Sequence, residues 1–273
     1  MLDRFACYEL CVQSPRHITA FLRALHGQHP TVLREDFAGT AAISRQWCLE
    51  AARAGESARA IAVELDAETS RRAAELMAES NLGASLKLIQ GNCLALPCNG
   101  QQSDAADVVF VGNFSIGYIH DRQALVQYLT HSLNRLRRGN AGFGGGIFAC
   151  DTYGGAGAFR LGGIERKHPG RRGEVIRYSW LHEHADPRTS TVRNSISFRV
   201  EINGEIAQEW PRAFVYEWRL WSIAELREAM AEVGFSDINV FKDVNVAPGE
   251  TPRPVDNPAE LGDDWIVIVA GRA

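Results

Sequence analysis

The stretch Glu35-Asp36-Phe37-Ala38-Gly39-Thr40-Ala41 decides the fold of this chain of 273 residues. It joins residues 31–34, a predicted strand, to a predicted helix that carries Ile43 and Trp47. A glycine between a strand and a helix lets ligand atoms approach the backbone, and the start of the helix offers free N–H groups. Because the pattern GxGxxG is absent, the loop argues against a dinucleotide and suits a ligand without a phosphate. The alternative is that Gly39 makes only a tight turn.

Strand and helix patterns alternate on both sides of this loop. Before it, Ser14 and Pro15 mark the start of a predicted helix, and Gly27 marks its end. After it come the apolar strands 60–65, 86–90, 108–112 and 146–150, with predicted helices over 67–81 and 122–138. Strands that alternate with helices form a parallel sheet, and uninterrupted apolar runs are typical of strands covered on both faces.

The pattern changes after residue 151. Residues 174–184, 191–202 and 205–220 alternate between apolar and polar side chains, and Asn203-Gly204 is a strong hairpin signal. Ser222 and Glu225 then form a capping box for a helix. The last two strands, 238–241 and 265–270, are joined by a proline-rich loop without a helix. We therefore predict an α/β fold: a Rossmann-like parallel sheet with an antiparallel edge hairpin, plus an inserted antiparallel β-meander.

Polar residues follow the other strands at the same edge of the predicted sheet. Glu64 ends the second strand, Asn92 and Cys93 follow the third, and Asn113 follows the fourth. An open parallel sheet binds ligands at the carboxyl ends of its strands, and an acid after the second strand can accept hydrogen bonds from both ribose hydroxyls. Asp66 is expected to cap the next helix, which leaves Glu64 free for the ligand. Asn92 can then bond an adenine amino group, and Cys93 can offer its backbone N–H.

In this order, the strand ends over residues 31–150 resemble those of class I S-adenosylmethionine-dependent methyltransferases. Residues 8–15, 35–40, 113–115 and 213–221 also look like a bacterial subgroup of that superfamily. The resemblance implies S-adenosylmethionine as the cofactor. It matches Glu35 to the acid of the family's first motif, Gly39 to the middle glycine of its Gly-x-Gly-x-Gly loop, Glu64 to its ribose-binding acid and Asn92 to the residue near adenine. Phe37 and Ala41 stand where the family has glycine, which predicts a tighter loop. The expected cofactor contacts are Glu35, Phe37, Gly39, Glu64, Leu65, Asn92, Cys93, Asn113 and Phe114.

Methyl transfer needs a nucleophile held in line behind the methyl group and, for a hydroxyl or a protonated amine, a base. Asp151 and Tyr153, at the end of the fifth strand, are the expected catalytic residues, although Asp151 could instead only cap a turn. The meander should roof this mouth with an aromatic wall that suits a cationic amine or an aromatic ring. The alternative is that these rings only fill a core. The expected substrate contacts are Tyr8, Tyr178, Trp180 and Trp218.

These assignments divide the chain into an N-terminal helical lid (1–30), a cofactor-binding Rossmann-like core (31–155), the meander (156–221) and a C-terminal part that completes the core (222–273). We expect a methyltransferase that acts on a small-molecule N or O nucleophile. One alternative is an inactive cofactor-binding module that works through a partner. Another is an aminopropyltransferase-like enzyme, although the paired acids it needs after the fourth strand are replaced by Asn113-Phe114-Ser115.

Composition narrows the expected partners to a small-molecule substrate. The net charge of −4 and the pI of about 6.1 argue against nucleic acid, and the basic stretch 166–172 is interpreted as a solvated loop. No apolar run suggests a signal peptide or a membrane span. Six cysteines without a CxxC pair favour reduced thiols in a cytoplasmic protein. His182, His184 and Asp186 have a spacing that can bind a metal, but a fourth ligand is missing, so we expect none. A monomer or a homodimer is expected.

Overall fold

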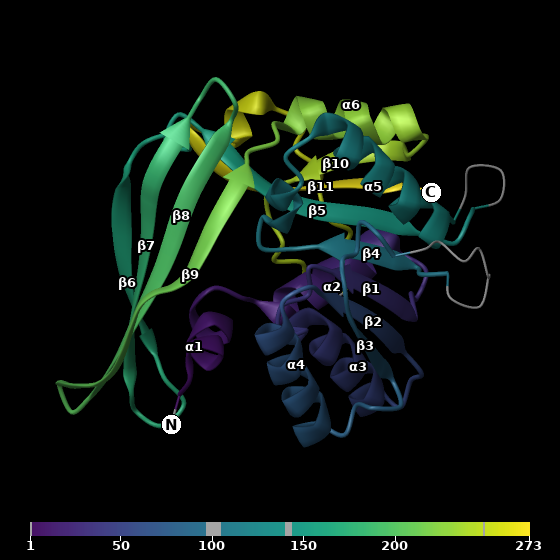
Figure 1. Ribbon diagram of the computed structural model, residues 1–273. Coiled ribbons are helices and arrows are strands. Elements are labelled where there is room, and N and C mark those ends of the chain that lie inside the picture. The colour runs from purple at the N-terminus through teal and green to yellow at the C-terminus, as the bar shows by residue number, and fades with distance from the viewer. Residues whose placement is uncertain (1, 97–104, 140–143, 248) are drawn as a thin grey trace.

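The main body is a seven-stranded sheet in the order β10-β11-β5-β4-β1-β2-β3 (Figure 1). The computed structural model describes residues 2–96, 105–139, 144–247 and 249–273. The strands β1 to β5 pair in parallel, whereas β11 is antiparallel to both β5 and β10. The Rossmann-like sheet is therefore confirmed, and the last two strands pair as predicted. Their bounds are β1 Val32–Asp36, β2 Arg59–Glu64, β3 Leu86–Gln90, β4 Val108–Val111, β5 Ile147–Gly155, β10 Ser236–Phe241 and β11 Asp264–Arg272.

Helices cover both faces of this sheet, as the apolar strands require. Figure 1 shows α5 and α6 on one side and α2, α3 and α4 on the other. Every residue of β1 and of β4 is buried between these layers. The predicted N-terminal helix is α2, which starts at Pro15, ends at His26 and is capped by Gly27 with φ of 76°. The bounds are α2 Pro15–His26, α3 Ala42–Ala54, α4 Ala67–Glu79, α5 Arg122–Arg135 and α6 Ile223–Val233.

The inserted meander is a separate antiparallel sheet in the order β6-β7-β8-β9. Its strands are β6 Gly162–Pro169, β7 Val175–Asp186, β8 Thr191–Ile202 and β9 Glu205–Arg219. The interpretation of the basic stretch as a loop is wrong for residues 166–169, which belong to β6 and are mostly exposed. A charged strand that ends in proline is typical of a sheet edge, where it discourages pairing with another chain.

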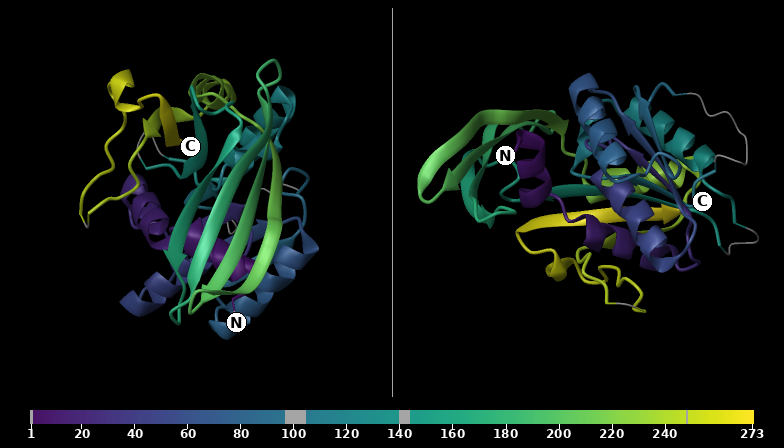
Figure 2. Two further views of the ribbon diagram at one scale, coloured as in Figure 1. Left: turned by 90° about the vertical axis from the view of Figure 1, so that its left-hand side faces the viewer. Right: turned by 90° about the horizontal axis from the view of Figure 1, so that it is seen from below.

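A short helix that the sequence did not predict, α1 (Arg4–Cys11), connects the two sheets. The Asp3 side chain caps it by accepting a hydrogen bond from the Ala6 N–H. Figure 2 shows α1 between the curved meander and the main sheet. Leu2 and Cys7 are buried in the apolar core on the inner face of the meander. The part of the N-terminal segment that covers the meander side is therefore α1, while α2 packs against the sheet and α3.

The described residues also show the state of the cysteines and the character of the helices. Cys7, Cys11, Cys48, Cys93 and Cys150 are free thiols, and Cys98 lies outside the described residues. No helix within the described ranges has the length and apolar character needed to span a membrane.

Candidate functional site

The loop after β1 adopts a left-handed backbone at three alternate positions. Phe37, Gly39 and Ala41 have φ values of 55°, 58° and 57°. Phe37 and Ala41 are unusual there, because this conformation costs a residue with a Cβ about 1–2 kcal/mol. Phe37 and Ala41, which stand where the resembled family has glycine, therefore keep a left-handed backbone. A Cβ built on Gly39 would meet nothing within 4 Å, so the middle of the loop faces open space.

Carboxylates from two neighbouring strands fix this loop. Glu35 is buried, and its Oε2 accepts hydrogen bonds from the Ser44 N–H at 2.8 Å and the Ser44 hydroxyl at 2.6 Å. Burial raises the pKa of Glu35 to about 7. Glu64 Oε2 accepts from the Gly39 N–H at 2.7 Å, and its Oε1 accepts from the Asp66 N–H at 2.8 Å. The expectation that Glu64 is free is therefore wrong, although Asp66 does cap α4 through the Thr69 N–H.

The ends of β2 and β3 lie side by side. The Gly91 N–H donates to the Glu64 carbonyl at 2.9 Å. Asn92 is exposed, and its side-chain oxygen accepts from the Leu94 N–H at 3.0 Å. Cys93 is buried, whereas the Leu65 side chain is 64% exposed. The structure thus brings the predicted residues of these two strands to one edge, with Leu65 and Asn92 on the surface.

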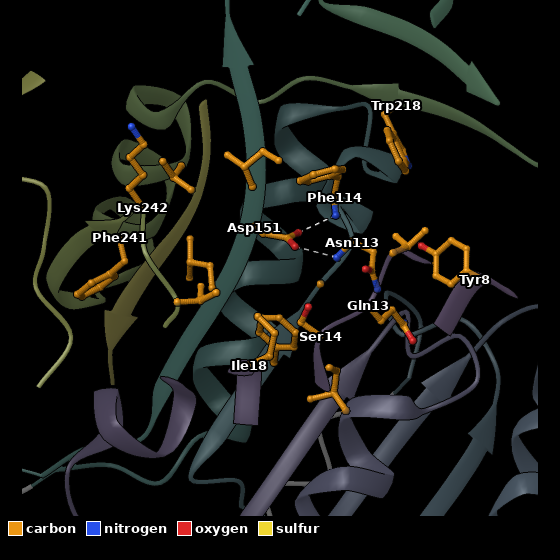
Figure 3. A pocket seen from close by; sticks show the side chains of 18 of the residues that line it. Tyr8, Gln13, Ser14, Ile18, Asn113, Phe114, Asp151, Trp218, Phe241 and Lys242 are labelled. Carbon is orange, nitrogen blue, oxygen red and sulfur yellow. Dashed lines mark hydrogen bonds between the residues drawn. The ribbon is translucent and has the colours of Figure 1, made fainter. Parts of the chain in front are cut away.

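Asp151, in the middle of β5, joins this strand to the end of β4 (Figure 3). Its carboxylate accepts from the Asn113 N–H at 2.9 Å and from the Phe114 N–H at 2.6 Å. Asn113 and Phe114 both have a left-handed backbone, with φ of 57° and 61°. Burial raises the pKa of Asp151 to about 7, while the two backbone hydrogen bonds act in the opposite direction. Asp151 therefore holds a strained turn and also lines the cavity described next.

A cavity of about 260 Å³ opens at these strand ends. Its polar lining comes from the α1–α2 connection, from the ends of β4 and β10 and from the middle of β5, and Figure 3 labels Gln13, Ser14, Asn113, Asp151 and Lys242. Its aromatic lining comes from α1, β4 and the residues after it, β10 and the meander: Tyr8, Phe110, Phe114, Phe241, Trp180 and Trp218. The loop after β1 and the ends of β2 and β3 lie beside this cavity rather than in its lining.

Three solved structures with a similar architecture are methyltransferases. One, an S-adenosylmethionine-dependent methyltransferase from Clostridium acetobutylicum, matches with a TM-score of 0.68 at 15% identity over 97% of this chain and 95% of the other. The CcbJ methyltransferase from Streptomyces caelestis matches with a TM-score of 0.64 at 18% identity, over 95% and 94%. CalS10, an amino pentose methyltransferase from Micromonospora echinaspora with S-adenosylmethionine bound, matches with a TM-score of 0.64 at 13% identity, over 100% and 98%.

The chain has the class I methyltransferase fold. No protein-family model and no curated protein matches its sequence.

In this methyltransferase fold, the meander supplies an aromatic wall to the cavity. The Trp218 ring is 2% exposed and stacks on Tyr216, with centroids 4.5 Å apart and planes at 19°. The ring centroids of Trp180 and Phe114 each lie 5.8 Å from that of Trp218. Tyr178 does not line the cavity and instead packs 6.0 Å from Phe198 inside the meander. Three of the four expected substrate contacts, Tyr8, Trp180 and Trp218, therefore line the cavity, while Tyr178 and Trp218 also belong to the buried core of the meander.

Tyr118, which the sequence analysis did not single out, bridges this wall to the loop after β1. It lies in the 3-10 helix η2 (Ser115–Tyr118), and its ring stacks on Phe37 at 6.0 Å and meets Trp218 edge-on at 6.1 Å. The side chain is 45% exposed. The aromatic residue at Phe37 could have pointed to such a contact, but the partner is 81 residues away in the chain.

A polar row crosses the inner face of the meander beside the wall. His182, Asn194 and Tyr216 lie opposite one another on β7, β8 and β9. Asn194 is fully buried, and its Nδ2 donates to the Tyr153 hydroxyl at 3.0 Å. Among the described residues, no hydrogen-bond partner reaches Asn194 Oδ1 or His182 Nδ1. Burial also lowers the pKa of His182.

Tyr153 belongs to this row rather than to the cavity lining. Its ring lies 4.8 Å from Phe114 and 6.2 Å from His182. The expected catalytic pair, Asp151 and Tyr153, is thus divided between the cavity and the polar row. Among the described residues, no three His, Cys, Asp or Glu side chains gather as a metal site would require, and Asp186 pairs with Arg188.

Proposed function

We propose that this protein is an S-adenosylmethionine-dependent methyltransferase that acts on an N or O nucleophile of a small molecule. The observation that carries the proposal is the loop after β1: three left-handed residues, with open space above Gly39, at the carboxyl end of a sheet with the class I methyltransferase fold. Ligands of open parallel sheets bind at this edge.

The residues at this edge fit the cofactor. Glu64 places a carboxylate beside the open space at Gly39, where it can exchange its backbone partners for ribose hydroxyls. Leu65 and Asn92 offer an apolar and a polar surface next to it, with Cys93 behind. Within the loop, the Phe37 ring stacks on Tyr118. The cavity beside the loop is lined by Asn113 and Phe114. Bound S-adenosylmethionine would supply a methyl group on a sulfonium, which needs no covalent intermediate with the protein.

The cavity and its aromatic wall are the proposed acceptor site. Tyr8, Trp180 and Trp218 present ring surfaces that suit a cationic amine or a flat ring. Asp151 is the acid among the described lining residues, and its raised pKa suits a group that accepts a proton near neutral pH. Tyr153 lies outside the lining and is proposed to act indirectly, by packing at 4.8 Å against Phe114 of the cavity wall.

Isothermal titration with S-adenosylmethionine tests the cofactor site. We expect wild type to bind, and Glu64→Ala to bind at least about tenfold more weakly, because a hydrogen-bonded carboxylate is lost. Glu209→Ala is the matched control, since it removes an equal charge from an exposed ion pair with Arg199 on the meander. Equal binding by Glu64→Ala and wild type would contradict the site, and absence of binding by wild type would contradict the proposed function.

Turnover separates the proposal from its two alternatives. Incubation with labelled S-adenosylmethionine and cell extract should release S-adenosylhomocysteine and label a small molecule, which mass spectrometry identifies. An inactive binding module would bind the cofactor and release no product. An aminopropyltransferase would turn over only the decarboxylated cofactor.

A further inference from the structure

Glu9 of α1 is hydrogen-bonded to the loop after β1. Its Oε1 accepts from the Thr40 hydroxyl at 2.5 Å and from Arg45 Nη2 at 2.5 Å. Arg45 Nε donates back to the Thr40 carbonyl at 3.2 Å, so Thr40 is held at both its hydroxyl and its carbonyl. The Glu9 and Arg45 side chains are only 14% and 13% exposed. This contact links the N-terminal helix to the loop whose open face is the proposed cofactor site.

The same helix also forms part of the acceptor cavity. Tyr8, the neighbour of Glu9, lines that cavity and meets Phe214 of β9 edge-on at 5.1 Å. The Arg4 guanidinium donates to the Ala213 carbonyl of β9 at 3.2 Å and pairs with Glu68 of α4 at 2.6 Å. One short helix therefore touches the cofactor loop, the main sheet's helices and the meander wall.

The energetics of these contacts differ. The Arg4–Glu68 pair has side chains 30% and 50% exposed, and such pairs contribute about 0–1 kcal/mol. The Glu9 contact is charge-assisted, less exposed and shared between two donors, which makes it the stronger tie. With 8 residues, α1 is too short to be stable in isolation, so its order depends on what it packs against. A helix of this kind can couple two sites, because ordering it at one site lowers the entropic cost of using it at the other.

We propose that Glu9 is a positioning residue that couples the cofactor site to the acceptor cavity. Through Thr40 and Arg45 it ties the loop after β1 to α1, so cofactor binding at the loop orders the helix that places Tyr8 in the cavity wall. The inference rests on the proposed function and adds to it a physical link between its two sites.

Two measurements on full-length protein test the coupling. Isothermal titration with S-adenosylmethionine should give affinity at least about fivefold weaker for Glu9→Ala than for wild type. Hydrogen exchange should show that the cofactor increases amide protection over residues 4–11 in wild type and not in Glu9→Ala. Thr40→Val removes the hydroxyl that donates a hydrogen bond to Glu9. This variant should shift both readouts in the same direction by a smaller amount. It also serves if Glu9→Ala does not fold.

Glu68→Ala is the matched control, because it breaks an ion pair of α1 that does not touch the loop. It should keep the affinity within about twofold of wild type, the range expected for an exposed pair. The inference is overturned if wild type binds while Glu9→Ala and Thr40→Val bind equally well and protect α1 equally. It is also overturned if Glu68→Ala weakens binding as much as Glu9→Ala, since α1 would then act only as packing. If wild type itself fails to bind, the proposed function falls first.

Discussion

Asp151 Oδ1 lies 2.6 Å from the backbone nitrogen of Phe114 and accepts its hydrogen bond, which links the middle of β5 to the turn after the parallel strand β4. The neighbouring Asn113 N–H donates to the other carboxylate oxygen at 2.9 Å. Two consecutive left-handed residues without glycine are costly, so this carboxylate compensates for a turn that the chain would otherwise avoid. This turn places Asn113 and Phe114 in the wall of the cavity.

The first prediction concerns the pH dependence of stability through Asp151. Burial raises its pKa in the folded protein from 3.8 to about 7, so between these values the folded state binds the proton more tightly than the unfolded state. The stability due to this group is therefore fully present below pH 3.8 and is lost as the pH rises toward 7. Relative to Asp151→Asn, which does not titrate, wild type should lose on the order of 2 kcal/mol between pH 5 and pH 8.

Urea unfolding of both proteins at several pH values measures this difference. Asp243→Asn is the control, because Asp243 accepts from the Asn245 N–H in an exposed turn, and its difference from wild type should not follow the same curve. If wild type instead gains stability over Asp151→Asn with rising pH, the two backbone N–H groups outweigh burial and the carboxylate is ionised at neutral pH.

The second prediction concerns the left-handed backbone at Phe37. Phe37→Ala and Phe37→Gly both remove the ring that stacks on Tyr118, so they differ only in the backbone. Because φ is 55° at this position, we expect the glycine variant to unfold with a free energy about 1 kcal/mol higher than the alanine variant.

Inside a helix alanine is more stabilising than glycine, so a helical position serves as the control. Ala74→Gly in α4 should lower the free energy of unfolding by about 1 kcal/mol. Chemical denaturation of the three variants gives both comparisons. Equal stability of Phe37→Ala and Phe37→Gly would mean that the loop relaxes out of the left-handed region once the ring is gone.

The third prediction concerns the contact between η2 and the meander. A Cβ on Gly117 would lie 2.8 Å from Trp218 Cβ and 3.0 Å from the Arg219 carbonyl, so alanine there must push β9 away. We expect Gly117→Ala to lower the free energy of unfolding by about 1–3 kcal/mol and to change the near-ultraviolet circular dichroism of the tryptophans. Gly83→Ala is the control, because a Cβ there meets nothing within 4 Å. Variants of equal stability would show that the meander docks loosely.

The sheet and its functional edge could be predicted from the sequence, because both follow from local patterns. Buried parallel strands read as apolar runs, and the residues after each run must meet at one edge. The contacts that complete the site could not be predicted in this way. Glu9 and Thr40 are 31 residues apart, and the Glu64 side chain is engaged by Gly39, 25 residues before it. Only the folded loop brings these pairs together.

Two elements escaped prediction for a different reason. α1 has only eight residues, too few for a helical apolar period to stand out, and it depends on packing into the meander core and on an exposed ion pair with α4. Most residues of β6 are exposed and only Ile164 is a large apolar residue, so the strand lacks the alternation that marked β7, β8 and β9. The polar row was hidden as well, since alternation places His182, Asn194 and Tyr216 on one line only after the strand register is known.

The last prediction uses that row. Asn194 contributes one hydrogen bond, to the Tyr153 hydroxyl, and leaves its Oδ1 buried without a partner among the described residues. Loss of the hydrogen bond costs about 1 kcal/mol, whereas an unpaired buried oxygen costs about 1–3 kcal/mol. Valine also suits the middle of a strand. Asn194→Val should therefore raise the free energy of unfolding by about 1 kcal/mol, with S-adenosylmethionine affinity unchanged and methyl transfer reduced. Asn239→Val in β10 controls for strand propensity, because the Asn239 amide donates to Asp237. A clear loss of stability in Asn194→Val, compared with Asn239→Val, would instead make the amide a structural tie to Tyr153.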